Sequence, residues 1–193
     1  MNKPPRMEPL NTPDAIEAAI RNTVALRKAA GSSTPVTADS VPEFVTTLLR
    51  HPDLYYRLTE LSMQLQGQGT LTARDRQLAI LRKAWLYQGA YVWGEHVKHS
   101  KRVGITSEEI ERVTQGSAAP GWTVHECALL RAVEELHSNA MISDTAWNVL
   151  AQRLDDRQLI ELPILVGQFT TMMYLQKSLR LRLTPGNVGM SAR

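Results

Sequence analysis

Apolar side chains recur along this chain at spacings of three and four residues, which is the period of helices that bury one face. Breaks rich in Gly, Pro and Ser, such as residues 31–35, separate these stretches. No stretch alternates apolar and polar residues between hairpin turns, as a strand would. We therefore predict an all-α bundle of about eight helices joined by short loops. The expected helices cover residues 13–30, 41–50, 53–66, 72–89, 90–103, 123–137, 143–153 and 155–183, and another starts at Thr106.

Several of these helices begin at a residue whose side chain can accept a hydrogen bond from the first helical turn. The signals are Thr72 with Asp75, Thr106 with Glu109, Thr123 with Glu126, and Ser143. One short similarity also links two helix starts, because residues 74–81 (RDRQLAIL) resemble residues 155–162 (DDRQLIEL). This similarity predicts a weak internal repeat in which one helical unit packs on a related one.

The length of 193 residues suits one compact domain that buries a real core. We predict a single helical domain over residues 13–183, with a flexible N-terminal arm at 1–12 and a flexible C-terminal tail at 184–193. The N-terminus lacks the apolar stretch of a signal peptide, and no window holds 18 uncharged apolar residues. We therefore predict a cytoplasmic protein that does not bind membranes.

The formal net charge is +3, and the basic runs at 98–102 and 177–182 carry polar or apolar residues between their charges. Such runs favour solvated helix faces, so we predict no nucleic-acid partner. The single cysteine, Cys127, excludes an internal disulfide framework and a thiolate-rich metal site. The role of Cys127 itself stays open.

Metal and nucleotide motifs do not fit the sequence. In Glu95-His96-x-x-His99 the histidines are three residues apart and the Glu comes first, whereas zincins place them four apart with the Glu between them. Glu134-x-x-His137 is a single Glu-x-x-His, and a di-iron bundle needs two of these. No glycine-rich phosphate loop occurs. We predict no metal and no nucleotide cofactor.

The most informative stretch runs from Tyr87 to His99. On a helix, Val92, His96, His99 and Val103 form one inward-facing seam, with Trp93 on one side of it and Glu95 on the other. A half-buried imidazole beside an aromatic side chain can act as a general acid or base. The alternative is a histidine that is merely hydrogen-bonded within a core or an interface.

Two charged residues stand among apolar neighbours, Arg82 after Ala79-Ile80-Leu81 and Glu161 between Ile160 and Leu162. Each can occupy a polar side of its helix or reach the surface with its charged end. Each can instead pair within the fold or line a pocket for an anionic ligand. We favour the surface for Arg82 and leave both alternatives open for Glu161.

Three ordered motifs resemble the carboxymuconolactone decarboxylase family, which includes the alkylhydroperoxidase D type. They are Arg74-x-Arg76-Gln77-Leu78-Ala79-Ile80-Leu81-Arg82, Trp93-Gly94-Glu95-His96-Val97, and Gly104-Ile105-Thr106-x-Glu108-Glu109-Ile110. The resemblance covers residues 40–183 and is strongest from Arg74 to Val113. It implies an alkylhydroperoxidase D-like helical fold with internal repetition, assembled as a homo-oligomer (dimer, trimer or hexamer), with no cofactor.

The resemblance also implies which residues occupy the family's catalytic positions. The family histidine falls on His96, the two cysteines of a Cys-x-x-Cys motif fall on Gly89 and Val92, and the relay glutamate falls on Gln77. Thiol peroxidases need a thiolate and a resolving thiol. Because both motif cysteines are missing, we reject thiol peroxidase activity.

The resemblance leaves a cofactor-free lyase (decarboxylase-like) or isomerase acting on a small carboxylated cyclic or lactone compound. His96 is the candidate general acid or base, with Glu95 and Gln77 beside it. The candidate substrate-binding residues are Arg82, Trp85, Tyr91, Trp93 and His99. The alternative is a non-catalytic ligand-binding or assembly protein on the same scaffold.

Overall fold

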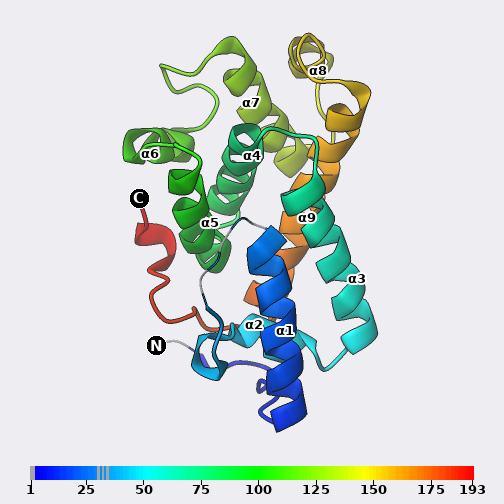
Figure 1. Cartoon of the computed structure of the whole chain (residues 1–193). Helices are drawn as coiled ribbons and strands as arrows, with labels where there is room; N and C mark the ends of the chain where they lie inside the picture. The colour runs from blue at the N-terminus through cyan, green and yellow to red at the C-terminus, as the bar shows by residue number, and fades with distance from the viewer. Residues whose placement is uncertain (1–2, 30, 32, 34) are drawn as a thin grey trace. The chain divides into compact units, whose positions relative to one another are not determined.

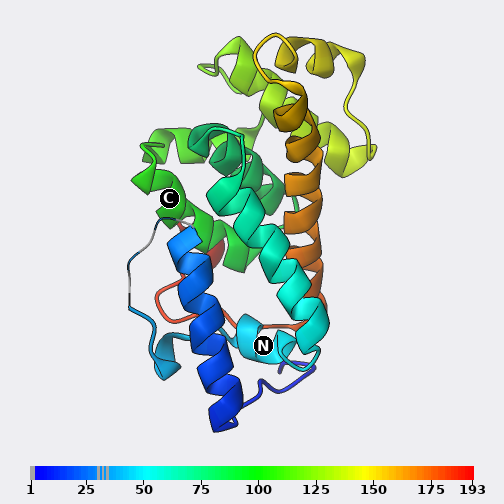
Figure 2. The ribbon, with the colours of Figure 1, turned by 45° about the vertical axis from the view of Figure 1, so that its right-hand side comes forward.

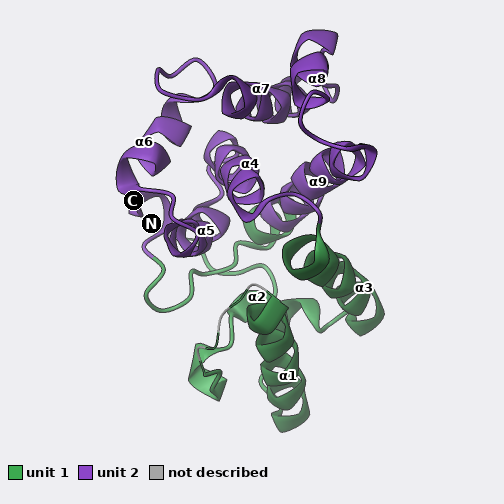
Figure 3. Ribbon diagram, turned by 45° about the horizontal axis from the view of Figure 1, so that its top comes forward, with its two compact units in different colours: residues 1–69, 174–187 green, residues 70–173, 188–193 purple. Residues whose placement is uncertain are grey.

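The computed structural model describes residues 3–29, 31, 33 and 35–193, and every regular element among them is helical. The predicted all-α class is confirmed. Met1, Asn2, Ala30, Ser32 and Thr34 lie outside the described residues, so the predicted break at 31–35 and the end of the first helix are described only in part. The chain divides into two compact units, residues 1–69 with 174–187 and residues 70–173 with 188–193 (Figure 3). The predicted single domain over 13–183 and its flexible arms stay predictions.

The first unit contains three helices, α1 (Pro13–Ala29), α2 (Glu43–Leu48) and α3 (Pro52–Met63), together with the short turns η1 (Ala38–Ser40) and η2 (Gln64–Gln68). Its buried core consists of Ala19, Val45, Leu49 and Tyr55. The helix α2 is shorter than the predicted span of 41–50, because it starts after Pro42 and ends before the His51-Pro52 break. The N-terminal arm is tied to this unit, since the Arg6 amide donates to the Leu179 carbonyl.

The second unit contains α4 (Ala73–Leu86), α5 (Ala90–Arg102), α6 (Ser107–Gln115), α7 (Val124–Ser138), α8 (Asp144–Leu150), most of α9 (Asp156–Leu179) and the turn η3 (Gly189–Ser191). The helices α5, α6 and α7 all pack against α4 (Figure 1). The capping residues Thr72, Thr106, Thr123 and Ser143 each accept a hydrogen bond from the backbone of the first turn, as predicted.

Helix α4 is the centre of the second unit, because every residue from Gln77 to Ala84 is buried. A helix that is buried all round cannot present a polar side to water, so its polar side chains need partners on neighbouring helices. Asp75 meets His125 of α7, with 3.1 Å between Oδ1 and Nε2. Burial acts to raise the pKa of Asp75, but the hydrogen bonds from His125 and Thr72 outweigh it and the pKa is lowered.

Helix α9 is one continuous helix (Figure 2, orange) that runs through Pro163 without a break. It ends at Leu179, short of the predicted Leu183, because Arg180 adopts a positive φ of 56° that a helix does not tolerate. No helix among the described residues is long and apolar enough to cross a bilayer. The cytoplasmic location stays a prediction.

The structure decides between the two alternatives for Glu161. Its carboxylate is buried and accepts hydrogen bonds from the amide and the hydroxyl of Thr70, at 2.5 and 2.8 Å, and from the amide of Leu71 at 3.4 Å. Charge-assisted bonds of this kind are stronger than neutral ones. Glu161 therefore ties α9 to the loop that precedes α4, and it pairs within the fold instead of reaching the surface.

We predict that Glu161→Gln lowers the free energy of unfolding by about 1–2 kcal/mol, because an amide keeps the shape but loses the charge and half of the acceptor capacity. The measurement is urea denaturation followed by circular dichroism. The matched control is Glu60→Gln, since Glu60 forms an exposed pair with Arg57 that contributes at most about 0.5 kcal/mol. Equal effects of the two substitutions would contradict the anchoring role.

Candidate functional site

A buried pair of side chains joins α4 to α5 at the predicted site. The Nδ1 atom of His96 lies 2.8 Å from Oε1 of Gln77, and both residues are buried. His96 lies on the face of α5 that packs toward α4, and Gln77 begins the fully buried stretch of α4. The structure thus brings together the two residues that the resemblance assigned to the catalytic histidine and to the relay position.

Aromatic side chains enclose the imidazole of His96. The ring of Phe169, from α9, meets it edge to face with 4.8 Å between centroids. The ring of His99, one turn further along α5, lies 5.2 Å away. We refer to His96, Gln77, His99 and Phe169 as the His96 site. The predicted inward seam of α5 holds for Val92 and His96, whereas His99 is half-buried and Val103 is exposed.

The environment keeps His96 neutral. Burial lowers the pKa of His96 well below 6.5, and the positive charges that His99 and Arg76 can carry lower it further. The pKa of His99 is also lowered, first by burial and then by Arg102, although Glu95 acts in the opposite direction. At neutral pH the His96 site therefore holds uncharged imidazole.

The partner of His96 also fixes the position of its proton. An amide oxygen can only accept a hydrogen bond, so Nδ1 of His96 donates to Gln77 and carries the proton. The other ring nitrogen, Nε2, then holds a lone pair. A neutral imidazole with one nitrogen anchored and the other unprotonated is a base that is already oriented.

Gly89 occupies one of the two motif-cysteine positions, and the side chain of Met173 fills the space next to it. A Cβ atom built on Gly89 would overlap the sulfur and Cγ of Met173, a fully buried side chain of α9. The φ of Gly89 is −83°, so the backbone suits any residue, and a Cβ there would need the flexible end of Met173 to move. The second cysteine position, Val92, is buried as an ordinary core residue.

Two of the candidate substrate-binding residues, Trp85 and Trp93, lie together, and the last residues of the chain cover them; their role toward a substrate stays a prediction. The rings of Trp85 and Trp93 lie 5.2 Å apart. Trp93 is fully buried, and its indole N–H donates to the carbonyl of Ala192 at 3.0 Å. The guanidinium of Arg193 lies over both rings. Tyr91 is half-buried in the first turn of α5.

Arg82 and Glu95 have partners outside the His96 site. Arg82 is buried, pairs with Glu134 at 2.9 Å and donates to the carbonyls of Val113 and Thr114, so the surface position favoured from the sequence is wrong. It follows Gln77 by five residues, which rotates its side chain by about 140° around α4. Glu95 pairs with Lys98 on the half-exposed side of α5. Substrate binding by Arg82 stays a prediction, and it requires Arg82 to leave Glu134.

The loop at Gly116 is shaped to hold this arginine. Gly116 has a φ of 94°, and a Cβ there would stand 2.5 Å from both the Arg82 guanidinium and the Glu134 carboxylate. Glu134 also accepts from the amide and the hydroxyl of Ser117. Arg82 therefore belongs to a cluster that ties the loop after α6 to α4 and α7.

The sequence did not indicate that Phe169 contacts His96, that Met173 approaches Gly89 or that the charge of Arg76 acts on His96. Phe169 and Met173 follow His96 by more than seventy residues, and their apolar spacing marks only a core face of α9. Arg76 was visible within the motif, where it directly precedes Gln77, and its charge acts on His96. Cys127 lies on α7, where its thiol donates to the carbonyl of Ser117 at 3.2 Å. Among the described residues, no group of three or more His, Cys, Asp or Glu side chains converges as metal ligands would.

The comparison with protein families agrees with these positions. Residues 52–135, which include Gln77, His96 and the Arg82 cluster, match the carboxymuconolactone decarboxylase family. The matched region is less than half of the chain, and over it the chain is similar to this family. No curated protein matches the sequence.

Several solved structures share the fold of this chain. An uncharacterized peroxidase-related protein from Silicibacter sp. is similar over 97% of both chains, with a TM-score of 0.74 and 14% identity. An alkylhydroperoxidase AhpD core protein from Ralstonia eutropha covers 95% of this chain and 94% of its own, with a TM-score of 0.73 and 15% identity. The debrominase Bmp8, in a variant bound to 2,3,4-tribromopyrrole, covers 96% and 95%, with a TM-score of 0.74 and 14% identity. These likenesses establish an alkylhydroperoxidase D-like fold.

We predict that the stability of the wild-type protein falls as the pH drops below 6.5. The unfolded chain protonates His96 near pH 6.5, whereas the folded chain keeps it neutral, so acid favours unfolding. His96→Gln removes this contribution, and its stability should fall less steeply, by up to about 1.4 kcal/mol for each pH unit below 6.5. Urea denaturation at pH 5.5, 6.5 and 7.5 measures the slopes.

The interval from pH 7.5 to 6.5 is the internal control for this measurement. Between pH 7.5 and 6.5 the unfolded chain is at most half protonated at His96, so wild type and variant should diverge there by no more than about 0.4 kcal/mol. Parallel curves at lower pH would show that His96 is not held neutral by the fold.

Proposed function

We propose that this protein is a cofactor-free enzyme that moves a proton on a small carboxylated cyclic or lactone compound, with His96 as its general base and acid. The observation that carries the proposal is the buried, neutral His96, whose Nδ1 is anchored on Gln77. A neutral imidazole accepts a proton at once, without first losing one. The reaction class is that of an isomerase or a lyase.

The proposed step begins with removal of a proton from a carbon next to a carbonyl group. Nε2 of His96 takes the proton, and the electron pair of the C–H bond moves into the carbonyl to form an enolate. The imidazolium, whose proton exchanges with solvent, then returns a proton to a carbon of the delocalised anion. No electrons leave the substrate, so the step needs no oxidant and no redox cofactor.

Isomerisation fits this resting state better than decarboxylation does. When a carboxylate leaves as CO₂, the carbon that carried it must be protonated by an acid. His96 would have to start as an imidazolium for that role, and burial disfavours this form. A decarboxylase would therefore need a second proton source, whereas an isomerase would need only His96.

The group that would bind a substrate carboxylate is Arg76 in this proposal. Arg76 is half-buried, and its positive charge acts on His96. Burial lowers the pKa of Arg76 and Glu161 raises it, and a guanidinium stays charged in either case.

The ring of Phe169 supports a small cyclic substrate. It lies edge-on to His96 and offers an apolar surface on which a flat ring can stack. The debrominase of the same fold binds 2,3,4-tribromopyrrole, which is a small flat ring. The fold is thus compatible with ligands of this size.

The second candidate function is a non-catalytic ligand-binding or assembly protein on the same scaffold. The observation that favours it is that the last residues of the chain cover Trp85 and Trp93. Trp93 is fully buried under Ala192, and Arg193 lies over Trp85. In this case His96 and Gln77 only form a hydrogen bond with each other inside the core, and neither acts on a substrate.

We predict that the wild-type protein catalyses hydrogen–deuterium exchange next to the carbonyl of at least one compound in a panel of lactone acids and keto acids. His96→Gln should lower the exchange rate by about 10²–10⁴-fold, which is the usual contribution of a general base. Proton NMR in D₂O measures the exchange, and the release of CO₂ from the same panel distinguishes a decarboxylase.

Two further variants make this test specific. His137→Gln alters an exposed histidine of α7 and should leave exchange unchanged. Gln77→Glu places a negative charge beside the imidazole, raises the pKa of His96 and should move the acidic limb of the rate profile to higher pH. Exchange that survives His96→Gln undiminished would remove His96 from the reaction and favour the non-catalytic candidate.

We also propose that the protein assembles into a homo-oligomer, as a dimer, trimer or hexamer. The support is an apolar solvent face of α9, on which Ile160 and Ile164 are 62% and 45% exposed and stand one turn apart. Exposed apolar side chains on one helix face are typical of subunit interfaces.

Size-exclusion chromatography with light scattering should give a mass that is a multiple of 21.6 kDa. The double substitution Ile160→Glu and Ile164→Glu should shift the mass toward one subunit, because charges at the centre of an interface cannot be buried unpaired. Val24→Glu, on the exposed face of α1, is the matched control. A wild-type mass of one subunit would contradict the assembly.

A further inference from the structure

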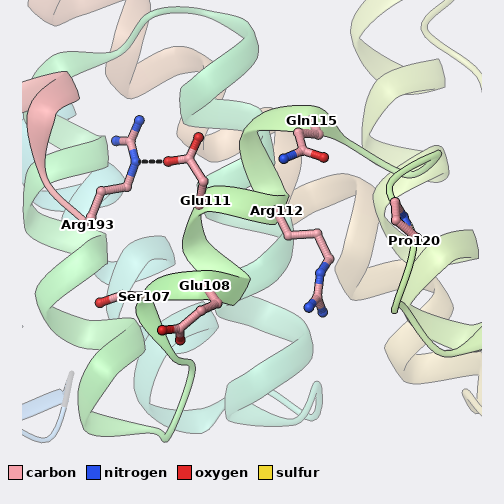
Figure 4. Close-up of a pocket in the computed structure, with 7 residues that line it drawn as sticks. All are labelled: Ser107, Glu108, Glu111, Arg112, Gln115, Pro120 and Arg193. Carbon is pink, nitrogen blue, oxygen red and sulfur yellow. Dashed lines mark hydrogen bonds and ion pairs between the residues drawn. The ribbon is translucent and has the colours of Figure 1, made fainter.

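The side chain of Arg193 lies in an aromatic and acidic setting within the second unit. Its guanidinium carbon is 5.5 Å from the ring centroid of Trp85 and 5.6 Å from that of Trp93. Its Nε donates to the carboxylate of Glu111, an ion pair that Figure 4 marks. Distances below about 6 Å to an indole ring are those of cation–π contacts. Trp85 of α4, Trp93 of α5 and Glu111 of α6 thus all contact the guanidinium of Arg193.

The backbone of the last residues is held both by this side chain and by contacts of its own. The guanidinium of Arg193 donates from Nη1 to the carbonyls of Met190 and Ala192, at 3.0 and 2.7 Å. The carbonyl of Ala192 also accepts from the indole N–H of Trp93, and η3 packs against α5. Removal of the Arg193 side chain should empty the space over the tryptophans, while the indole hydrogen bond and the packing on α5 still hold the segment.

We propose that Trp85, Trp93 and Glu111 form a binding site for small guanidinium compounds, which Arg193 occupies as an intramolecular competitor. We call these three residues the cation box. The occupant seen in the structure demonstrates the fit, because a guanidinium stacks on indole faces and donates to a carboxylate at the same time. A free ligand with the same group can make the same contacts.

The surface next to the box favours ligands with a second positive charge. A depression of about 580 Å³ adjoins Arg193, and its lining includes Glu108, Glu111, Gln115 and Arg112 (Figure 4). Arg112 is engaged elsewhere, since it donates to the carbonyl of Gly121 and lies over the ring of Trp122. Once Arg193 is removed, the two carboxylates exceed the one remaining cation, so the local charge attracts cations.

The tethered arginine explains why a free ligand would bind the wild-type protein weakly. A group held on the same chain competes at an effective concentration of about the millimolar range. The side chain of Arg193 is 32% exposed, so exchange with solvent does not require the core to open. A ligand gains access when the side chain swings out, and it binds better when that side chain is missing.

The test is a titration with agmatine, a guanidinium compound with a distal ammonium, followed by tryptophan fluorescence and calorimetry. Arg193→Ala should bind agmatine at least about tenfold more tightly than the wild type, because it lacks the competitor. Arg193→Lys keeps a tethered cation and should stay close to the wild type. Circular dichroism verifies that each variant is folded.

Two double variants and a second probe locate the binding. Arg193→Ala with Glu111→Gln and Arg193→Ala with Trp85→Leu should each bind agmatine at least about tenfold more weakly than Arg193→Ala alone. Putrescine, which replaces the guanidinium by an ammonium, should bind Arg193→Ala more weakly than agmatine does. The proposal is overturned if Arg193→Ala gains no affinity for agmatine, or if the gain is indifferent to Glu111 and Trp85.

Discussion

The central constraint on the second unit is that α4 is buried on all sides and yet carries polar side chains. Water cannot satisfy them, so each must find its partner on another helix. Asp75 meets His125 of α7, Gln77 meets His96 of α5, and Arg82 meets Glu134 of α7. Lys83 is the exception, because its ammonium lies over the ring of Tyr87 and burial lowers its pKa to about 8. A hydrogen bond requires two specific atoms to meet, whereas apolar packing does not. These pairs therefore fix how α4 is rotated about its axis and how far each neighbouring helix is shifted along it.

The same constraint gives His96 its chemical character. A glutamate at position 77 would stabilise an imidazolium, whereas the amide of Gln77 holds the ring in one orientation without supplying a charge. Burial against Phe169 then removes the water that would otherwise solvate a cation. Positioning therefore comes from the contact with Gln77 and neutrality from burial, and the proposed proton transfer depends on both.

Sequence signals that span only a few residues correctly predicted the helix caps. The caps at Thr72, Thr106, Thr123 and Ser143 depend on residues three positions away, and all of them form. The resemblance placed His96 and Gln77 at catalytic positions, but their hydrogen bond was not predicted, because nineteen residues and a loop separate the two. The burial of Arg82 could not be foreseen, since its partners Glu134 and the carbonyls after α6 are distant in the chain. The contacts of Ala192 and Arg193 depend on the last residues folding back onto α5. The hydrophobic pattern of the sequence does not predict such long-range packing.

The close approach of Met173 to Gly89 couples the start of α5 to α9. A β-carbon at position 89 needs the volume that the methionine sulfur already fills, so the flexible end of Met173 would have to turn aside within a closely packed core. Any side chain introduced at position 89 therefore acts first on α9.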